Sequence, residues 1–84
     1  MYKKAFCVLL CLTMGCGADP KAVLVPIENI PENLMTIAHE KLPGVTFEQA
    51  VIRGDGRYEI SGKDGRGKVR EIELSRSGEI LEIE

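Results

Sequence analysis

The spacing of apolar residues in this 84-residue chain predicts an α+β fold, with one N-terminal helix packed on a four-stranded antiparallel meander sheet in two layers. Before Pro43, apolar residues recur every three or four positions, which is typical of a helix with one buried face. After Gly44 they fall on alternate positions, which is typical of strands with one buried face. Short glycine-bearing segments divide this second part, and such short turns favour antiparallel neighbours.

The helix is expected to begin at Pro31, because proline suits the first helical position, where its missing N–H leaves no hydrogen bond unmade. Pro43 and Gly44 should end it, since proline cannot continue a helix and glycine accepts the left-handed conformation that follows one. Ile30 offers no side-chain oxygen as a cap. The buried face of this helix would carry Leu34, Ile37, Ala38 and Leu42.

Four strands are expected after the helix, each with one side facing it. Their predicted ranges are Val45–Arg53, Arg57–Gly62, Lys68–Ser75 and Glu79–Glu84. The side chains predicted to face the helix are Phe47, Val51, Tyr58, Ile60, Ile72, Leu74, Leu81 and Ile83.

The other face of the predicted sheet is mostly acidic. Antiparallel sheets commonly expose one polar face, so a solvated surface is one interpretation of this pattern. The alternative is that this face, or an edge strand of the sheet, binds a protein partner. The candidate partner-binding residues are Glu48, Glu59, Glu71, Glu73 and Glu82.

The first eighteen residues have the pattern of a secretory signal peptide. Lys3 and Lys4 precede an uncharged apolar run that is too short to span a bilayer as a helix. Residues 12–16, Leu-Thr-Met-Gly-Cys, resemble a bacterial lipobox, which predicts cleavage after Gly15 and lipidation of Cys16. Cleavage after Ala18 is the alternative, and it would give a free secreted protein. Residues 19–30 contain two prolines and are predicted to be a tether, within which residues 22–25 can form a short extended piece. Residues 31–84 are expected to form the domain.

Catalytic, metal-binding and cofactor-binding residues are not expected in this chain. Its three cysteines all lie within the first sixteen residues, and His39 is its only histidine. Neither a zinc site nor a nucleophile–base pair can be assembled from these parts, so we expect no enzyme, metal or cofactor. From Gly17 onward, nine basic residues face thirteen acidic ones, a net charge of −4 that argues against nucleic acid as a partner.

The order of helix, proline-glycine stop, and strands joined by glycine turns resembles the PepSY and PepSY-like domains of bacterial exported proteins. Residues 42–47 and 68–81 carry this resemblance, which extends over residues 31–84. The resemblance implies an extracytoplasmic binding or inhibitory module, sometimes associated with peptidases, with no catalytic residues. The predicted function is therefore such a module held at the cell envelope by a lipid anchor. A structural envelope lipoprotein, or a secreted domain without a discrete partner, is the alternative.

Overall fold

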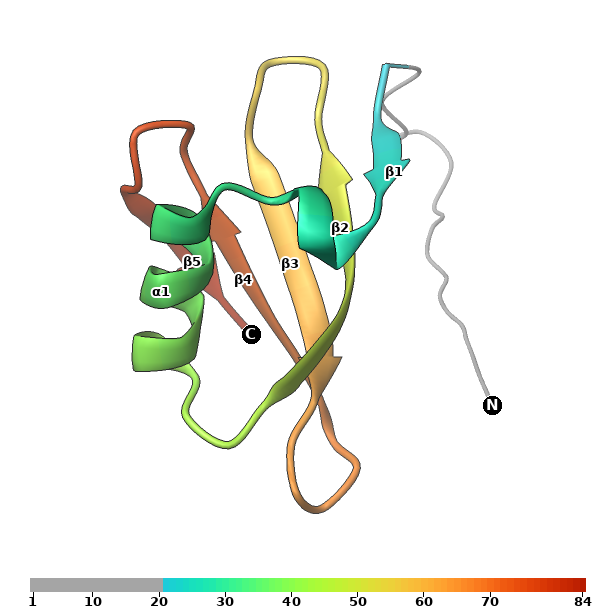
Figure 1. The fold of residues 1–84 in the computed structure, drawn as a ribbon, viewed down its shortest axis with the longest axis vertical. Helices are drawn as coiled ribbons and strands as arrows, with labels where there is room; N and C mark the ends of the chain where they lie inside the picture. Colours follow the sequence, from blue (N-terminus) through green and yellow to red (C-terminus); the bar gives the residue numbers. More distant parts are fainter. Residues whose placement is uncertain (1–20) are drawn as a thin grey trace.

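The computed structural model describes residues 21–84, which form one helix, one 3-10 turn and one five-stranded sheet (Figure 1). All neighbouring strands are antiparallel, and their order in the sheet, β1-β2-β3-β4-β5, follows the sequence. The predicted α+β class is confirmed. In chain order the elements are β1 (Val23–Val25), η2 (Ile27–Asn29), α1 (Glu32–Lys41), β2 (Thr46–Ile52), β3 (Tyr58–Lys63), β4 (Val69–Leu74) and β5 (Ile80–Ile83).

The sheet has one strand more than predicted, and α1 follows a strand rather than opening the domain. β1 lies within the segment predicted to be a tether, and it pairs with β2 so that Val23 lies opposite Ile52. The same segment contributes η2 and the buried side chain of Ile30. A three-residue strand is too short to show alternation, and its partner lies far along the chain, so periodicity alone does not reveal it.

The ends of α1 lie close to where the sequence places them. Pro31 occupies the N-cap position, and its carbonyl oxygen accepts hydrogen bonds from the backbone N–H groups of Leu34 and Met35, at 3.0 and 3.1 Å. At the other end, the N–H of Leu42 donates to the carbonyl of Ala38 at 2.9 Å. The left-handed conformation of Gly44, with φ of 83°, then turns the chain toward β2.

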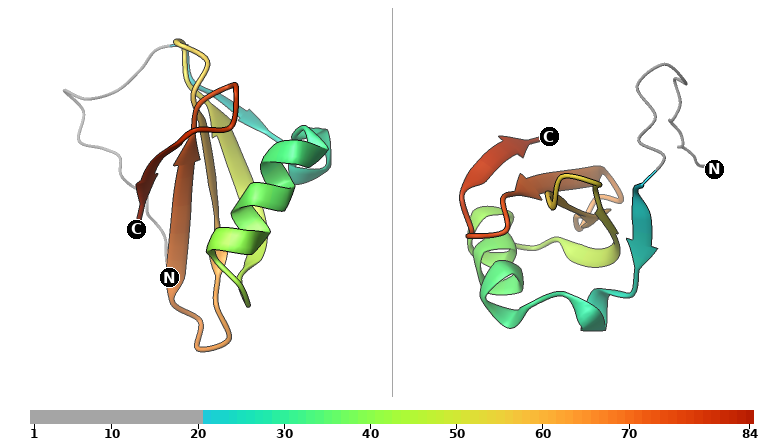
Figure 2. Two further views of the ribbon diagram at one scale, coloured as in Figure 1. Left: turned by 90° about the vertical axis from the view of Figure 1, so that its left-hand side faces the viewer. Right: turned by 90° about the horizontal axis from the view of Figure 1, so that it is seen from above.

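The hydrophobic core lies between α1 and the face of the sheet that α1 covers (Figure 2). Gly62 allows β2 and β3 to approach closely on this face, because a Cβ at that position would collide with the Thr46 carbonyl and lie 2.6 Å from the Phe47 Cα. The buried apolar residues are Ile30, Leu34, Ala38, Leu42, Val45, Phe47, Ala50, Ile60, Ile72 and Leu74. Among the described residues, no helix covers the opposite face, which we call the open face.

Two irregularities in strand pairing and the edge position of β5 overturn three of the predicted core positions. A β-bulge between Phe47 and Gln49 shifts the alternation of β2, so Ala50 is buried while Val51 lies opposite Glu59 on the open face. A second irregularity, in the pairing of β4 with β5, leaves Leu81 without a direct cross-strand partner. The prediction that Leu81 and Ile83 are core residues is therefore wrong, since they are 47% and 42% exposed.

Candidate binding surface

Five glutamates from three neighbouring strands meet on the open face, and we call them the acidic ladder. They are Glu59 on β3, Glu71 and Glu73 on β4, and Glu82 and Glu84 on or next to β5. Glu73 lies directly opposite both Glu59 and Glu82. Glu71 and Glu84 exchange both of their backbone hydrogen bonds, each 2.8 Å long. Like charges placed directly across strands repel, so this arrangement lowers the stability of the sheet unless cations or protons compensate.

The ladder contains four of the five acidic residues predicted for this face. Glu48 is not among them, because it is the additional residue of the bulge in β2 and has no direct partner on β3. Glu84 is a member that the prediction missed. The signal was present in the sequence, since Glu84 lies two positions beyond Glu82 and side chains two apart in a strand share a face.

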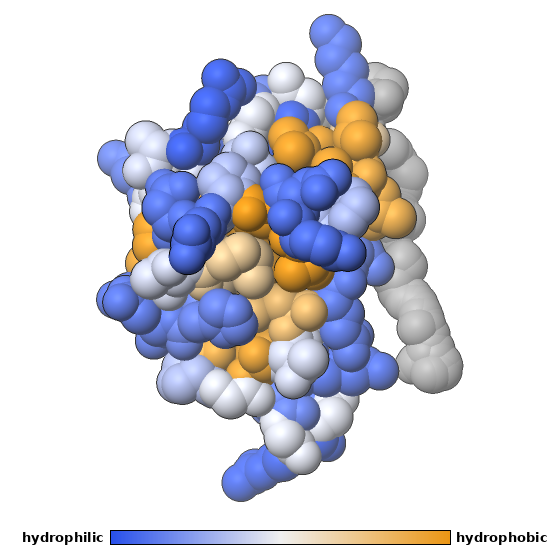
Figure 3. Space-filling view, viewed as in Figure 1, coloured by the Kyte–Doolittle hydropathy of each residue, from blue (hydrophilic) through white to orange (hydrophobic). Residues whose placement is uncertain are grey.

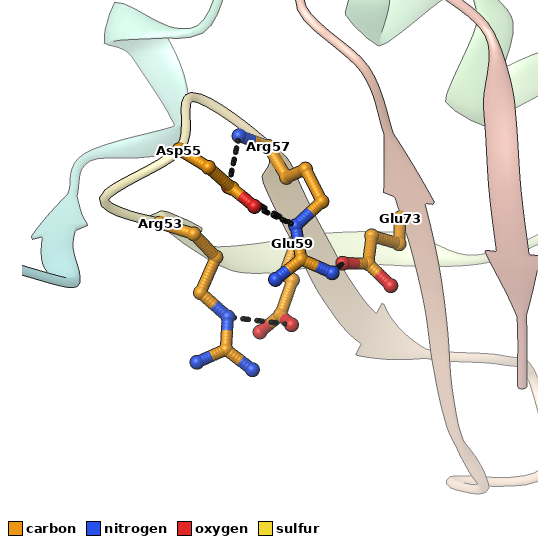
Figure 4. A network of polar contacts seen from close by, with 5 residues as sticks. All are labelled: Arg53, Asp55, Arg57, Glu59 and Glu73. Atoms are coloured by element: carbon orange, nitrogen blue, oxygen red, sulfur yellow. Dashed lines mark hydrogen bonds and ion pairs between the residues drawn. The ribbon is translucent and has the colours of Figure 1, made fainter. Parts of the chain in front are cut away.

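Two arginines neutralise the end of the ladder nearest the β2–β3 hairpin (Figure 4). Arg53 Nε lies 3.0 Å from Glu59 Oε2, and Arg57 Nη1 lies 2.7 Å from Glu73 Oε2. Asp55 in the hairpin holds Arg57 in place, with 2.8 Å between Arg57 Nε and Asp55 Oδ2. The hydrogen bonds from Arg57 lower the pKa of Asp55, so this carboxylate stays charged and keeps the guanidinium oriented toward Glu73.

Burial has the largest effect on the pKa of Glu73 even though this residue has an arginine partner. The residue is only 8% exposed, and burial raises the pKa of its carboxyl group. The charge of Arg57 acts in the opposite direction but does not cancel this effect. Glu73 is thus a buried carboxylate that depends on one guanidinium, because an unpaired charge at such a position is costly.

At the other end of the ladder the nearest guanidinium, that of Arg70, binds backbone: its Nε donates to the main-chain oxygen of Glu84 at 3.1 Å. Among residues 21–84, no ion pair joins Glu71, Glu82 or Glu84 to a basic side chain. Burial raises the pKa of Glu71 to about 7, and repulsion by Glu59, Glu84, Glu73 and Glu82 adds to this shift. Hydrogen bonding with Glu82 and repulsion by it raise the pKa of Glu84. Keeping Glu71 and Glu84 ionised in the folded protein therefore costs free energy.

The outer edge of β5 lies next to this uncompensated end of the ladder. Within the described chain no further strand pairs with it, and Ile80, Leu81 and Ile83 are 42%, 47% and 42% exposed. Because Glu84 exchanges its backbone hydrogen bonds with Glu71, the adjacent residue Ile83 directs its own N–H and C=O away from β4. The edge thus combines backbone hydrogen-bonding groups with exposed apolar side chains.

The opposite edge of the sheet, β1, is apolar but carries no acidic ladder. Its Val23 and Leu24 are 55% and 67% exposed, and an apolar patch is visible over β1 at the upper right of Figure 3. Leu24 lies opposite Val51 rather than a carboxylate. The two edges therefore differ in charge while both expose aliphatic side chains.

His39 is exposed on α1 and contacts an aromatic side chain of the core. Its ring meets the ring of Phe47 edge-on, with 5.1 Å between the centroids. No three His, Cys, Asp or Glu side chains within residues 21–84 are placed to hold a metal ion. In the same part of the chain, no helix is long and apolar enough to cross a membrane. Cys16, the predicted signal peptide and both candidate cleavage sites lie outside the described residues.

The fold and this surface together define a small α+β domain with an acidic open sheet face and an apolar outer edge on β5. No family model, curated protein or solved structure matches the chain. Its function is therefore argued from the surface itself.

Proposed function

We propose that this protein is a non-catalytic, extracytoplasmic binding module that holds a protein partner by strand addition at the outer edge of β5. One observation carries the proposal: this edge combines outward-directed backbone groups of Ile83 with the exposed side chains of Ile80 and Leu81. Edge strands of this kind are normally shortened, charged or covered, because they pair readily with other chains. In strand addition, an extended partner segment makes main-chain hydrogen bonds to such an edge.

The proposed location is the cell envelope, with the lipid on Cys16 as the anchor. The basic residues Lys3 and Lys4, the apolar run and the lipobox-like sequence support export and lipidation. The resemblance of residues 31–84 to PepSY-like domains favours the same compartment and makes a peptidase the proposed class of partner. In that case the module would act as an inhibitor or a docking subunit.

The anchor can be tested by measuring the intact mass of the protein produced in a bacterial host with its own N-terminus. A chain that starts at Cys16 and carries diacylglyceryl and acyl groups is expected, and Cys16→Ala should abolish both features. An unmodified chain that starts at Asp19 would contradict the anchor and make the protein a free secreted domain.

Binding at β5 can be tested by site-specific photo-crosslinking in the native cell. A photoreactive residue in place of Leu81 is expected to give one defined adduct. The same residue in place of Thr36, which is exposed on α1, should give none. Ile83→Pro should remove the Leu81 adduct, because it deletes an N–H that points away from β4 and leaves the Glu71–Glu84 hydrogen bonds in place. The absence of any adduct at Leu81 would instead favour a structural envelope protein without a discrete partner.

A further inference from the structure

We infer that the segment added at β5 alternates basic and apolar residues, with Lys or Arg side chains beside Glu82 and Glu84 and apolar side chains beside Ile83. This inference rests on the proposed strand addition and names the class of segment that would bind. It follows from the two faces of β5, from the distribution of charge along the acidic ladder, and from the mismatch with a second copy of this chain.

The register of β5 separates acidic from apolar side chains. Glu82 lies opposite Glu73 and Glu84 opposite Glu71, so both point to the open face. Ile83 lies opposite Ile72 and points to the face that α1 covers elsewhere. A strand added in register alternates with the same period of two, so its side chains would lie in turn beside carboxylates and beside an isoleucine.

Ion pairs between arginines and the carboxylates of the ladder occur at one end of it, among the described residues. Arg53 and Arg57 pair with Glu59 and Glu73, at 3.0 and 2.7 Å. Within the described residues, the carboxylates of Glu82 and Glu84 have no ion-pair partner, and the guanidinium of Arg70 donates to the main-chain oxygen of Glu84 instead. The position directly across from each of them on an added strand is therefore where a cation would form a stabilising cross-strand pair.

The raised pKa of Glu71, which lies opposite Glu84, supports the same conclusion. The groups that act on this carboxyl group are Glu59 on β3, Glu73 on β4 and Glu82 and Glu84 at β5, all of them acidic. A basic side chain arriving beside Glu84 would offset the repulsion that acts on Glu71, because opposite charges on neighbouring strands attract.

A second copy of this chain does not fit this edge. Pairing β5 with another β5 would bring Glu82 and Glu84 of both copies onto the same face and add to the repulsion. Pairing β5 with β1 of another copy would place the aliphatic residues Val23–Val25 against the ladder and leave its charges uncompensated. A cationic, alternating segment from a different protein is the complementary occupant.

Peptide titrations followed by NMR test this inference. The protein would be the full chain with Cys16→Ala, so that no lipid is attached. The probe is a capped peptide of about eight residues that alternates lysine and valine. A peptide that alternates glutamate and valine controls for charge, and one with the lysines and valines in separate blocks controls for order. We expect the alternating lysine peptide alone to shift and protect the amide of Ile83.

Variants of the ladder should change this affinity selectively. The double variant Glu82→Gln, Glu84→Gln should weaken binding of the lysine peptide about fivefold, since it removes two cross-strand charge pairs. The matched variant Glu48→Gln should leave the affinity unchanged, because Glu48 is exposed and lies outside the ladder. Added salt at about 0.5 M should weaken binding to the unsubstituted protein more than to the double variant.

The possible outcomes of these titrations distinguish failure of the charge preference from failure of strand addition at β5. Equal binding of the lysine and glutamate peptides at β5 would overturn the charge preference and leave strand addition standing. Equal binding of the alternating and block lysine peptides would show attraction without strand pairing, which also overturns the inference. Failure of every peptide to bind would also overturn the inference. The crosslinking at Leu81 would then decide independently whether β5 has a partner.

Discussion

The two faces of β4 show how differently one strand can be used. On one side, Ile72 and Leu74 are fully buried under α1. On the other side, Glu71 and Glu73 belong to the acidic ladder, and burial raises the pKa of each of these two carboxyl groups. The covered face contributes the apolar burial that stabilises the fold, whereas the open face holds charges at a cost in stability. A surface that lowers stability in this way is more consistent with binding than with structural support.

The largest expected effect is on the covered face, where Gly62→Ala should destabilise the protein by about 4 kcal/mol. The new methyl group would collide with the backbone of Thr46 and Phe47, which no rotamer change can relieve. Urea unfolding measures the loss. Gly65→Ala is the matched control, because no atom lies within 4 Å of the Cβ it would add. Similar midpoints for the two variants would show that β2 and β3 do not approach closely at Gly62.

The next effect tests whether α1 covers the sheet. Leu34→Ala should lower the free energy of unfolding by about 3 kcal/mol, because it leaves a cavity where the side chain is 1% exposed. Asn33, the exposed neighbour of Leu34 on the same helix, provides the control. Asn33→Ala should change the free energy of unfolding by less than about 0.5 kcal/mol. Equal losses for the two variants would contradict the packing of α1 against the core.

On the open face the expected change has the opposite sign. Folding raises the pKa of Glu71 from 4.5 to about 7, so the folded state binds more protons than the unfolded state between these values. The contribution of Glu71 to stability is therefore greatest below about pH 4.5 and is lost as the pH rises to about 7. Glu71→Gln should stabilise the protein by about 2 kcal/mol at pH 8, after allowance for solvent screening, and by little at pH 4.

Unfolding of the Glu71→Gln variant and of the unsubstituted protein across this pH range measures the difference. Glu48→Gln serves as the control, because Glu48 is exposed and has no direct partner on β3. Parallel profiles for Glu71→Gln and the unsubstituted protein would show that Glu71 titrates as an exposed carboxyl group.

The smallest expected effect concerns the neutralised end of the ladder. Arg57→Gln should destabilise the protein by about 1 kcal/mol at neutral pH, because it leaves the buried carboxyl group of Glu73 without its counter-ion. The pKa of Glu73 should rise further, which NMR titration of its side chain can follow. Arg66→Gln, at an exposed turn position without a carboxylate partner within 4.0 Å among the described residues, is the control. No difference between the two variants would mean that Arg57 does not stabilise Glu73.

Much of the fold follows from local chemistry in the sequence. The helix begins beside Pro31 and ends before Gly44, as predicted, because these residues restrict the backbone directly. The three hairpins from β2 to β5 lie where glycine-bearing turns predict them. Clustering of Glu59, Glu71, Glu73 and Glu82 could be predicted because the period of two is preserved through β3 and β4.

Other features depend on contacts between distant residues. β1 became a strand only because β2 supplies its hydrogen bonds, and three residues carry no readable period. The bulge after Phe47 moved Ala50 into the core in place of Val51, and local sequence does not specify such an extra residue. The exposure of Ile83 depends on the strand order, which places β5 at an edge of the sheet.

By itself the sequence determined the α+β class, the ends of the helix, the turns and the acidic character of one sheet face, because each depends on residues close in the chain. Only the tertiary structure decided which carboxylates have arginine partners and which edge of the sheet carries uncompensated charge. Those properties depend on register and strand order, and a shift of one residue changes every side-chain neighbour across a sheet.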